Sequence, residues 1–118
     1  MKTTTRQVGS VTVVDISGRI VLEQTVRLRR FVCDLLDTGH AQIVFNLSNV
    51  EWIDSAGLGC LVGSLTSSRK RKADLKLLNP TEKVRDVLRM TKLHTVFQIF
   101  KNEHEAVKSF GQSAAATA

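Results

Sequence analysis

The sequence has few of the residues that disulfides, metal sites and aromatic recognition surfaces require. Its 118 residues include two cysteines, three histidines, one tryptophan, five phenylalanines and no tyrosine. No apolar run approaches the ~20 residues that cross a bilayer, and no apolar segment opens the chain as a secretion signal would. We therefore expect a cytoplasmic protein without membrane insertion.

The cysteines and histidines form no recognisable ligand set. Cys33 and Cys60 fall on predicted helices, at or near their buried faces, with no CxxC motif and no histidines clustered near them. This placement favours small reduced core residues over a disulfide or a metal site. The spacings of His94, His104 and the cysteines match no familiar zinc pattern. We predict no metal site and no cofactor.

Length and composition indicate one folded domain. The chain is 42% hydrophobic and 24% charged, which is typical of a globular domain and unlike a disordered segment. It is too short for two ordinary domains. We place a single domain at residues 1–110 and predict a flexible C-terminal tail at residues 111–118, which are small and polar.

The net charge of +6 raises the question of an acidic partner. Arg27, Arg29 and Arg30 fall on one predicted helix, and the run Arg69–Lys72 closes the next. A nucleic-acid binder using that run is one hypothesis, but no aromatic residue interleaves with the basic residues. We therefore expect no nucleic-acid partner. A solvated face, or a surface that steers an acidic protein, is the favoured interpretation.

Hydrophobic periodicity predicts alternating strands and helices. Strands are expected at residues 3–8, 11–16 (ended by Gly18), 42–47, 74–78 and 96–100. Helices are expected after Thr25, with a stripe of Leu28, Phe31, Val32 and Leu35, from Ser55, after an Asn79 cap with Pro80 next, and after an Asn102 cap. This alternation calls for right-handed crossovers. We predict an α/β fold, a mixed and mostly parallel sheet of four or five strands with four helices.

The most informative segment joins the third strand, through a short polar connection, to the second helix. Asp54 and Ser55 are both good helix N-cap residues. A hydroxyl at a helix start lies beside free backbone N–H groups and the positive end of the helix dipole, which suits an added phosphate. Two interpretations of Ser55 follow, a plain N-cap and a phosphate acceptor. The apolar residues with helical spacing after it are Leu58, Leu61, Val62 and Leu65.

Two catalytic interpretations of the same segment fail on spacing. The glycines at 57, 59 and 63 miss the GxGxxG pattern of dinucleotide sites, because Val62 stands where the third glycine belongs. Ser55 lacks the first glycine of a GxSxG nucleophile motif, and no histidine is placed by the sequence to activate it. We expect no enzymatic activity.

The motif Asp54-Ser55-Ala56-Gly57-Leu58-Gly59 resembles the phosphorylation loop of the STAS family, the anti-sigma factor antagonists. The resemblance extends from about Arg6 to Phe110 in length and order of elements. It implies the STAS fold and matches Ser55 to the family's phosphorylated serine. It also matches Asp54 to the acidic residue before that serine, implied to orient the hydroxyl or a kinase-bound metal.

The resemblance further implies the partners of such a protein in bacterial transcription regulation. The unmodified form binds an anti-sigma factor that is also a serine kinase and so frees its sigma factor. Phosphorylation of Ser55 switches the binding off, and a PP2C-type phosphatase resets the cycle. The implied contact residues are Asp54, Ser55, Ala56, Gly57 and Leu58, with Arg19, Ile20 and Val21 from the neighbouring loop.

One departure from the family pattern supports a second hypothesis. The loop that contains Gly18 and Arg19 commonly has an acidic residue in the family at the position of Val21. Together with the basic charge, this favours a STAS interaction module of a larger assembly. A stressosome-like scaffold and a lipid-transport ABC complex are the examples that we consider.

Overall fold

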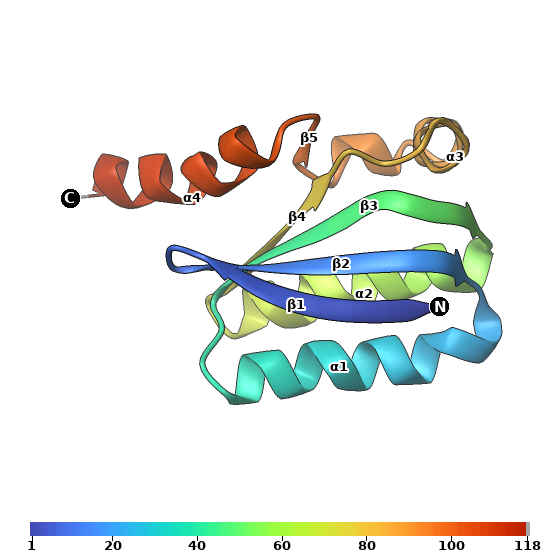
Figure 1. Ribbon diagram of the computed structural model, residues 1–118, viewed down its shortest axis with the longest axis horizontal. Helices are drawn as coiled ribbons and strands as arrows, with labels where there is room; N and C mark the ends of the chain where they lie inside the picture. Colours follow the sequence, from blue (N-terminus) through green and yellow to red (C-terminus); the bar gives the residue numbers. More distant parts are fainter. Residues whose placement is uncertain (118) are drawn as a thin grey trace.

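The computed structural model describes the backbone of residues 1–117 and the side chains of residues 1–110. Strands and helices alternate in the predicted order (Figure 1): β1 (Lys2–Val8), β2 (Val11–Ile20), α1 (Thr25–Asp37), β3 (Gln42–Ile53), α2 (Ser55–Lys70), β4 (Asp74–Leu78), α3 (Glu82–Met90), β5 (Ile99–Phe100) and α4 (Glu103–Thr117). Two short 3-10 helices, η1 (Leu22–Gln24) and η2 (Leu93–Thr95), precede α1 and β5. The predicted flexible tail at 111–118 lies outside the described side chains and stays a prediction.

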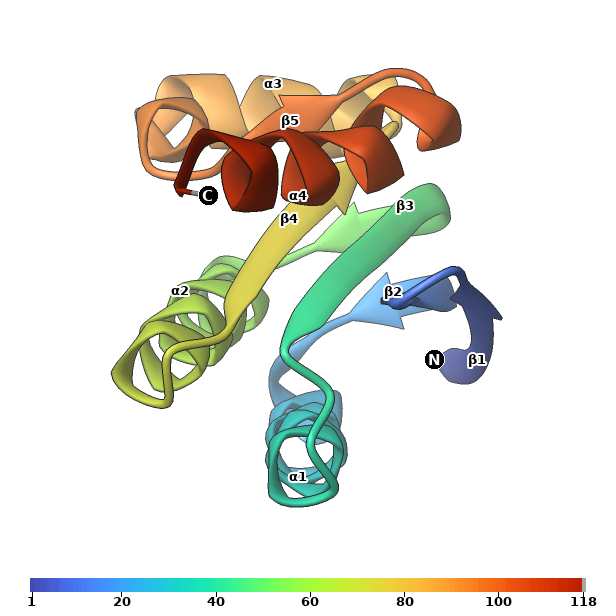
Figure 2. The same ribbon diagram turned by 90° about the vertical axis from the view of Figure 1, so that its left-hand side faces the viewer.

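The strands form one sheet in the order β1-β2-β3-β4-β5. β1 pairs antiparallel with β2, and every other neighbouring pair is parallel. Figures 1 and 2 show α1 and α2 together on one face of the sheet, with α4 on the other side and α3 near β5 at the sheet edge. The predicted α/β fold with a mixed, mostly parallel sheet is confirmed. Because the strands β2 to β4 run the same way, the starts of α1, α2 and α3 gather at one end of the molecule.

Side-chain alternation along the strands supplies both faces of the core. On β2, Val14 and Ile16 belong to the larger hydrophobic cluster, which also contains the buried residues of α1, α2 and α3. Val11 and Val13 belong to a smaller cluster, which Ala106 and Phe110 of α4 cover. A strand buried on both faces must be apolar at successive positions, as this one is.

Two strands extend further than the sequence pattern predicts. Gly18 does not end β2, which continues to Ile20, and the expected polar connection after Leu47 is the second half of β3. The two extensions pair with each other, and the register shifts next to Gly18, whose φ is +93°. A glycine tolerates this left-handed backbone in a bulge. The bulge explains why a residue that usually ends a strand is found inside one.

The start of α3 is displaced from the predicted cap. Asn79 is not the N-cap; its φ of +47° places it in a left-handed turn before the helix. The cap is Thr81, whose Oγ1 accepts a hydrogen bond from the Val84 N–H and donates to the Val50 carbonyl at 2.8 Å. One hydroxyl therefore begins α3 and fastens it to β3.

Two smaller predictions are also wrong. The last strand contains Ile99 and Phe100 alone, because η2 and the buried side chain of Phe97 occupy the chain before it. Cys33 is exposed on α1, whereas Cys60 is buried as predicted. Asn102 does cap α4, with its Oδ1 3.3 Å from the Glu105 amide nitrogen.

A buried lysine and an ionic network hold α4 against the sheet. Lys76 on β4 is 3% exposed, and its Nζ lies 2.7 Å from Ser109 Oγ and 4.2 Å from the centre of the Phe110 ring. Burial lowers the pKa of this ammonium. The attraction between the cation and the ring face offsets part of the cost of burying the charge.

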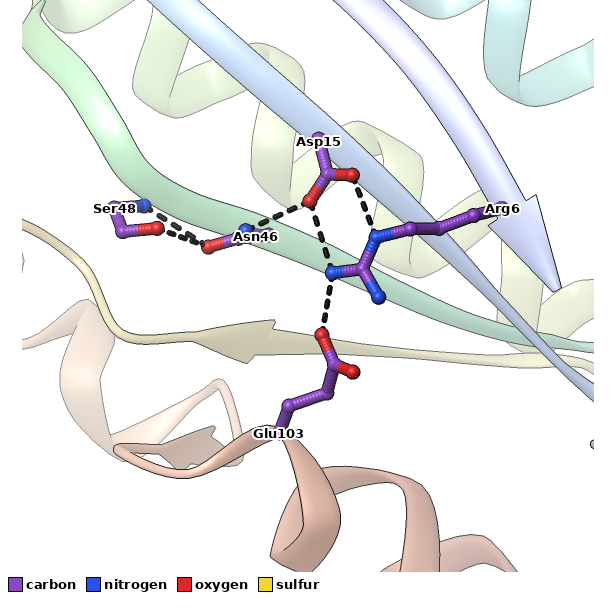
Figure 3. A network of polar contacts seen from close by, with 5 residues as sticks. All are labelled: Arg6, Asp15, Asn46, Ser48 and Glu103. Atoms are coloured by element: carbon purple, nitrogen blue, oxygen red, sulfur yellow. Dashed lines mark hydrogen bonds and ion pairs between the residues drawn. The ribbon is translucent and has the colours of Figure 1, made fainter. Parts of the chain in front are cut away.

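The ionic network joins β1, β2 and β3 to the first turn of α4 (Figure 3). Arg6 Nε lies 2.7 Å from Asp15 Oδ2, and the same guanidinium contacts the Glu103 carboxylate. Asn46 Nδ2 donates to Asp15 Oδ1 at 2.7 Å. The hydrogen bonds from Arg6 lower the pKa of both Asp15 and Glu103. All three charged groups remain partly exposed, so each pair contributes about 1 kcal/mol or less.

We expect Arg6→Gln to reduce the free energy of unfolding at pH 7 and to lose this effect in acid. A carboxyl whose pKa is lowered by folding stabilises the protein above its ordinary pKa, here 3.8 for Asp15 and 4.5 for Glu103. That contribution disappears as the pH falls through the lowered values. Urea unfolding at pH 7 and pH 3 measures it. The loss in free energy of unfolding caused by Arg6→Gln should be smaller at pH 3 than at pH 7. Arg30→Gln, at an exposed position of α1, should cause no loss at either pH. A loss for Arg6→Gln that does not change with pH would contradict the role given to these ion pairs.

Candidate functional site

Asp54 connects three segments at the end of the molecule where α2 begins. It is the N-cap of α2, and its Oδ1 accepts a hydrogen bond of 2.8 Å from the Gly57 N–H. Its Oδ2 accepts a bond of 3.1 Å from the Leu22 N–H in η1. Its own N–H donates to the Ile20 carbonyl of β2 at 3.3 Å. Both carboxylate oxygens are thus occupied by backbone donors, which fixes the β2–η1 loop against the helix start.

Ser55 is the first residue of α2, and its side chain is exposed. The prediction that the helix begins at or near Ser55 is confirmed. The interpretation of Ser55 as a plain N-cap is wrong, because Asp54 fills that position. Ser55 belongs to the first helical turn, where the helix dipole favours negative charge.

Gly57 sets how closely α2 approaches β2. A Cβ atom built on Gly57 would lie 2.1 Å from the Ile20 carbonyl oxygen and 2.8 Å from Ile53 Cγ1. Any larger residue must push the helix start away from the strand ends. Gly59, two residues further along the same helix, has no atom within 4 Å of an added Cβ. The two glycines of the motif therefore differ: the first allows close packing, and the second lies on the open side.

The structure brings the eight predicted contact residues together but does not expose all of them. Ser55 and Arg19 are exposed, and Asp54, Ala56 and Val21 are half-buried. Ile20, Gly57 and Leu58 are buried, with Ile20 fully enclosed. The three buried residues position the loop and the helix start from the protein interior, and the other five contribute to the surface of the site.

Two apolar residues beside this site were not among the predicted contacts. Leu22, whose N–H bonds to Asp54, is 64% exposed, and Val26 on the first turn of α1 is 69% exposed. Cys60 Sγ approaches the Thr25 carbonyl at 3.6 Å, so α1 begins next to the first turns of α2. The sequence contained a signal for Val26, which lies off the apolar stripe that α1 buries, but not for Leu22, which precedes that helix. An apolar side chain on the polar side of a helix indicates a contact surface.

The basic run after α2 is partly neutralised. Arg71 Nη1 lies 2.7 Å from Asp37 Oδ1, and Arg69 Nε lies 3.6 Å from Asp74 Oδ1. These pairs connect the C-terminal ends of α1 and α2 and the start of β4, at the opposite end of the sheet from Ser55. The run thus has a structural use, which weakens its interpretation as a nucleic-acid surface.

Among the described residues, no histidine forms a hydrogen bond with Ser55. His40 shares a hydrogen bond of 2.7 Å with Thr12 Oγ1 near the start of β2, far along the strand from Asp54. Within residues 1–117, His, Cys, Asp and Glu side chains nowhere gather in a group that could hold a metal ion. Over the same residues, every helix is too short or too polar to cross a membrane. Ser55 is thus an exposed residue at the start of α2, beside the exposed apolar side chains of Leu22 and Val26.

Comparison with known proteins decides the family. Residues 2–106 match the model of the STAS domain. The chain belongs to the STAS family. A Thermotoga maritima protein whose assigned role is anti-sigma factor antagonist is 34% identical over 88 residues, which cover 74% of this chain and 78% of that protein.

Solved STAS structures have the same fold. The crystal structure of a Thermotoga maritima protein assigned as an anti-sigma factor antagonist has a TM-score of 0.84 and 30% identity, and covers 91% of this chain and 92% of that chain. The antagonist SpoIIAA in its unphosphorylated form has a TM-score of 0.80 at 20% identity, with 94% and 97% covered. Bacillus SpoIIAA in its phosphorylated form has a TM-score of 0.71 at 20% identity, with 92% and 99% covered. Both forms of SpoIIAA thus share the fold of this STAS protein.

The two glycines of the motif provide a matched pair of substitutions. We expect Gly57→Ala to lower the free energy of unfolding by about 2–3 kcal/mol, because its Cβ meets a backbone carbonyl that cannot move independently. We expect Gly59→Ala to raise it by about 0.5–1 kcal/mol, since alanine is the better helix former and the space is open. Urea unfolding measures both. Equal effects of the two substitutions would contradict the close approach of α2 to Ile20.

Asp54 should tolerate asparagine better than alanine. Asp54→Ala removes both acceptors and should cost about 1–2 kcal/mol, the usual cost of losing an N-cap. Asp54→Asn retains one oxygen for the Gly57 N–H but offers the Leu22 N–H an amide donor, so it should cost less than alanine. Thermal unfolding orders the three proteins. An asparagine variant as unstable as the alanine variant would show that the cap contributes nothing beyond the bond to Leu22.

Proposed function

We propose that this STAS protein is an anti-sigma factor antagonist, and that phosphorylation of Ser55 switches its binding. In its unmodified form it binds an anti-sigma factor that is also a serine kinase, and the bound factor releases its sigma factor. The kinase transfers phosphate to Ser55, the complex dissociates, and a PP2C-type phosphatase restores the unmodified form. The protein acts in the bacterial cytoplasm by binding alone.

One observation is central to this proposal: Ser55 is an exposed hydroxyl on the first residue of α2, next to the Asp54 carboxylate. A kinase can reach such a hydroxyl without unfolding the protein. The relatives support the general role, since the Thermotoga maritima protein and a Staphylococcus aureus protein are both named as antagonists.

The switch needs no change of fold. A phosphate at the first helical position is favoured by the helix dipole and by the free N–H groups. The same phosphate adds nearly two negative charges beside Asp54, in a surface that a partner must dehydrate. The exposed apolar side chains of Leu22 and Val26 border this surface. Their burial by a partner requires the phosphate to lose its water as well, which opposes binding.

The proposed partner is a protein and not a nucleic acid. Arg69 and Arg71 of the basic run already pair with Asp74 and Asp37. Of the residues named at this site, Leu22 and Val26 are exposed and apolar, and Arg19 is the one cation. This composition suits a protein interface better than the backbone of DNA or RNA.

Variants of Ser55 test the switch. Ser55→Ala should bind the anti-sigma factor kinase as tightly as the unmodified protein, and Ser55→Asp should bind at least about tenfold more weakly, which corresponds to about 1.4 kcal/mol. Thr66→Asp adds the same charge to an exposed position three turns along α2 and is the matched control. Isothermal titration calorimetry measures the affinities. Mass spectrometry after incubation with the kinase and ATP should find the phosphate on the peptide that contains Ser55.

Equal affinities for Ser55→Ala and Ser55→Asp would remove the switch from the proposal. Elution of the protein in a very large particle, or its co-purification with a membrane ATPase, would then support the alternative of a STAS subunit in a scaffold or a lipid-transport complex.

A further inference from the structure

A groove of about 190 Å³ lies between α3 and β5 and shares no lining residue with the Ser55 surface. Its floor is apolar and formed by Leu88, Ile99 and Pro80, of which Leu88 and Pro80 are buried. Its rim is cationic or titratable, formed by Arg85, Arg89, His94 and Lys101. Small-molecule sites usually enclose about 300–1,000 Å³. A groove of this size accommodates one or two side chains, which suits a peptide segment better than a whole metabolite.

The segment that forms this groove is basic. Residues 80–101 contain five lysines and arginines against two acidic residues, a net charge of +3. The basic run Arg69–Lys72 at the end of α2 carries more positive charge, but it is partly paired with Asp74 and Asp37.

The cationic side chains at the rim form few ion pairs within the protein. Arg85 Nη2 donates to the Pro80 carbonyl at 3.1 Å, which holds its guanidinium beside the groove. Arg89 lies 4.0 Å from Asp86, the limit of an ion pair, with both side chains more than half exposed. Lys101 and His94 are exposed and form no ion pair with any described residue. These groups are free to bind carboxylates.

The strand next to the groove also has backbone groups that no neighbouring strand pairs with. β5 is an edge strand; the Gln98 carbonyl accepts a hydrogen bond from Leu77 of β4, and the Phe100 carbonyl accepts one from Asn79, just after β4. Because backbone groups alternate in direction along a strand, the N–H and C=O of Ile99 face away from β4. An extended segment can pair with these groups and place its side chains beside the groove.

We propose that the groove between α3 and β5 is a second docking site, which binds an extended acidic segment of a partner protein. An apolar side chain of the segment packs on Leu88 and Ile99, and its carboxylates pair with Arg89 and Lys101. The groove shares no residue with the Ser55 surface, so this site is independent of the proposed switch. Its lining includes no aromatic platform for nucleic-acid bases beyond His94.

A short blocked peptide, Glu-Asp-Leu-Glu-Asp-Leu-Glu-Asp, is the probe. Titrated into the ¹⁵N-labelled full-length protein, it should shift the amide signals of Leu88, Arg89, Ile99 and Lys101 and leave those of Ser55 and Gly57 unchanged. The same peptide with Gln and Asn in place of Glu and Asp should bind at least about fivefold more weakly. Increasing the salt concentration should weaken the binding of the acidic peptide, because salt screens the attraction between charges.

Matched double variants separate the groove from the net charge. The double variant Arg89→Gln, Lys101→Gln should bind the acidic peptide about fivefold more weakly than the unmodified protein. The double variant Lys70→Gln, Lys72→Gln removes the same charge at the end of α2 and should change the affinity less than about twofold. All four positions are exposed, so thermal unfolding should confirm that both variants fold. Ser55→Asp should bind the peptide as the unmodified protein does, which keeps this test separate from that of the switch.

Three results would overturn the proposal. The neutral peptide could bind as tightly as the acidic one, or both double variants could weaken it equally, which would leave only a general charge effect. Alternatively, vesicles of phosphatidylglycerol or a DNA duplex could shift the groove signals where the peptide does not, which would assign the cations to a lipid or nucleic-acid surface.

Discussion

The hydrogen bonds of the Asp54 carboxylate hold together the end of this STAS protein that contains Ser55. It accepts hydrogen bonds from the N–H groups of Gly57 and Leu22, while the Asp54 amide donates to Ile20. One residue thus joins the ends of β2 and β3, the η1 loop and the start of α2. The arrangement is compact because Gly57 lacks a side chain where the Ile20 carbonyl lies. Without these contacts, Ser55 would still be present in the sequence, but neither its exposure nor its neighbours would be fixed.

The parts of this arrangement that depend on local sequence were predictable. The start of α2 at Ser55 followed from the cap residues and the apolar periodicity after them, and β4 was predicted to the residue, from Asp74 to Leu78. The order of the elements was sufficient to predict a mixed, mostly parallel sheet. The resemblance of the Asp54–Gly59 motif to the STAS family named the family correctly, because the motif and the order of elements agreed.

Features that depend on tertiary contacts were not predictable. Gly18 is usually a strand terminator, yet a bulge and the pairing with β3 keep it within β2. Asn79 is a good cap by type, but Thr81 can also bond to the Val50 carbonyl, a contact that exists only once β3 is in place. In the candidate site, the sequence located Asp54 and Ser55. It could not show that Ile20 is enclosed or that Leu22 is exposed, because these depend on how η1 folds against α2.

Charge arithmetic limits how the proposed switch can act. Phosphate on Ser55 changes the net charge of the chain from +6 to about +4, so the protein remains basic and long-range attraction to an acidic partner persists. The effect on binding must therefore arise at contact distance, where the phosphate and Asp54 would have to be dehydrated together with Leu22 and Val26. Contact-range penalties act mainly on dissociation rates, and steering charges act on association rates. The basic groove between α3 and β5 shares no lining residue with the Ser55 surface, so in the proposed scheme its cations and the switched residue are separate.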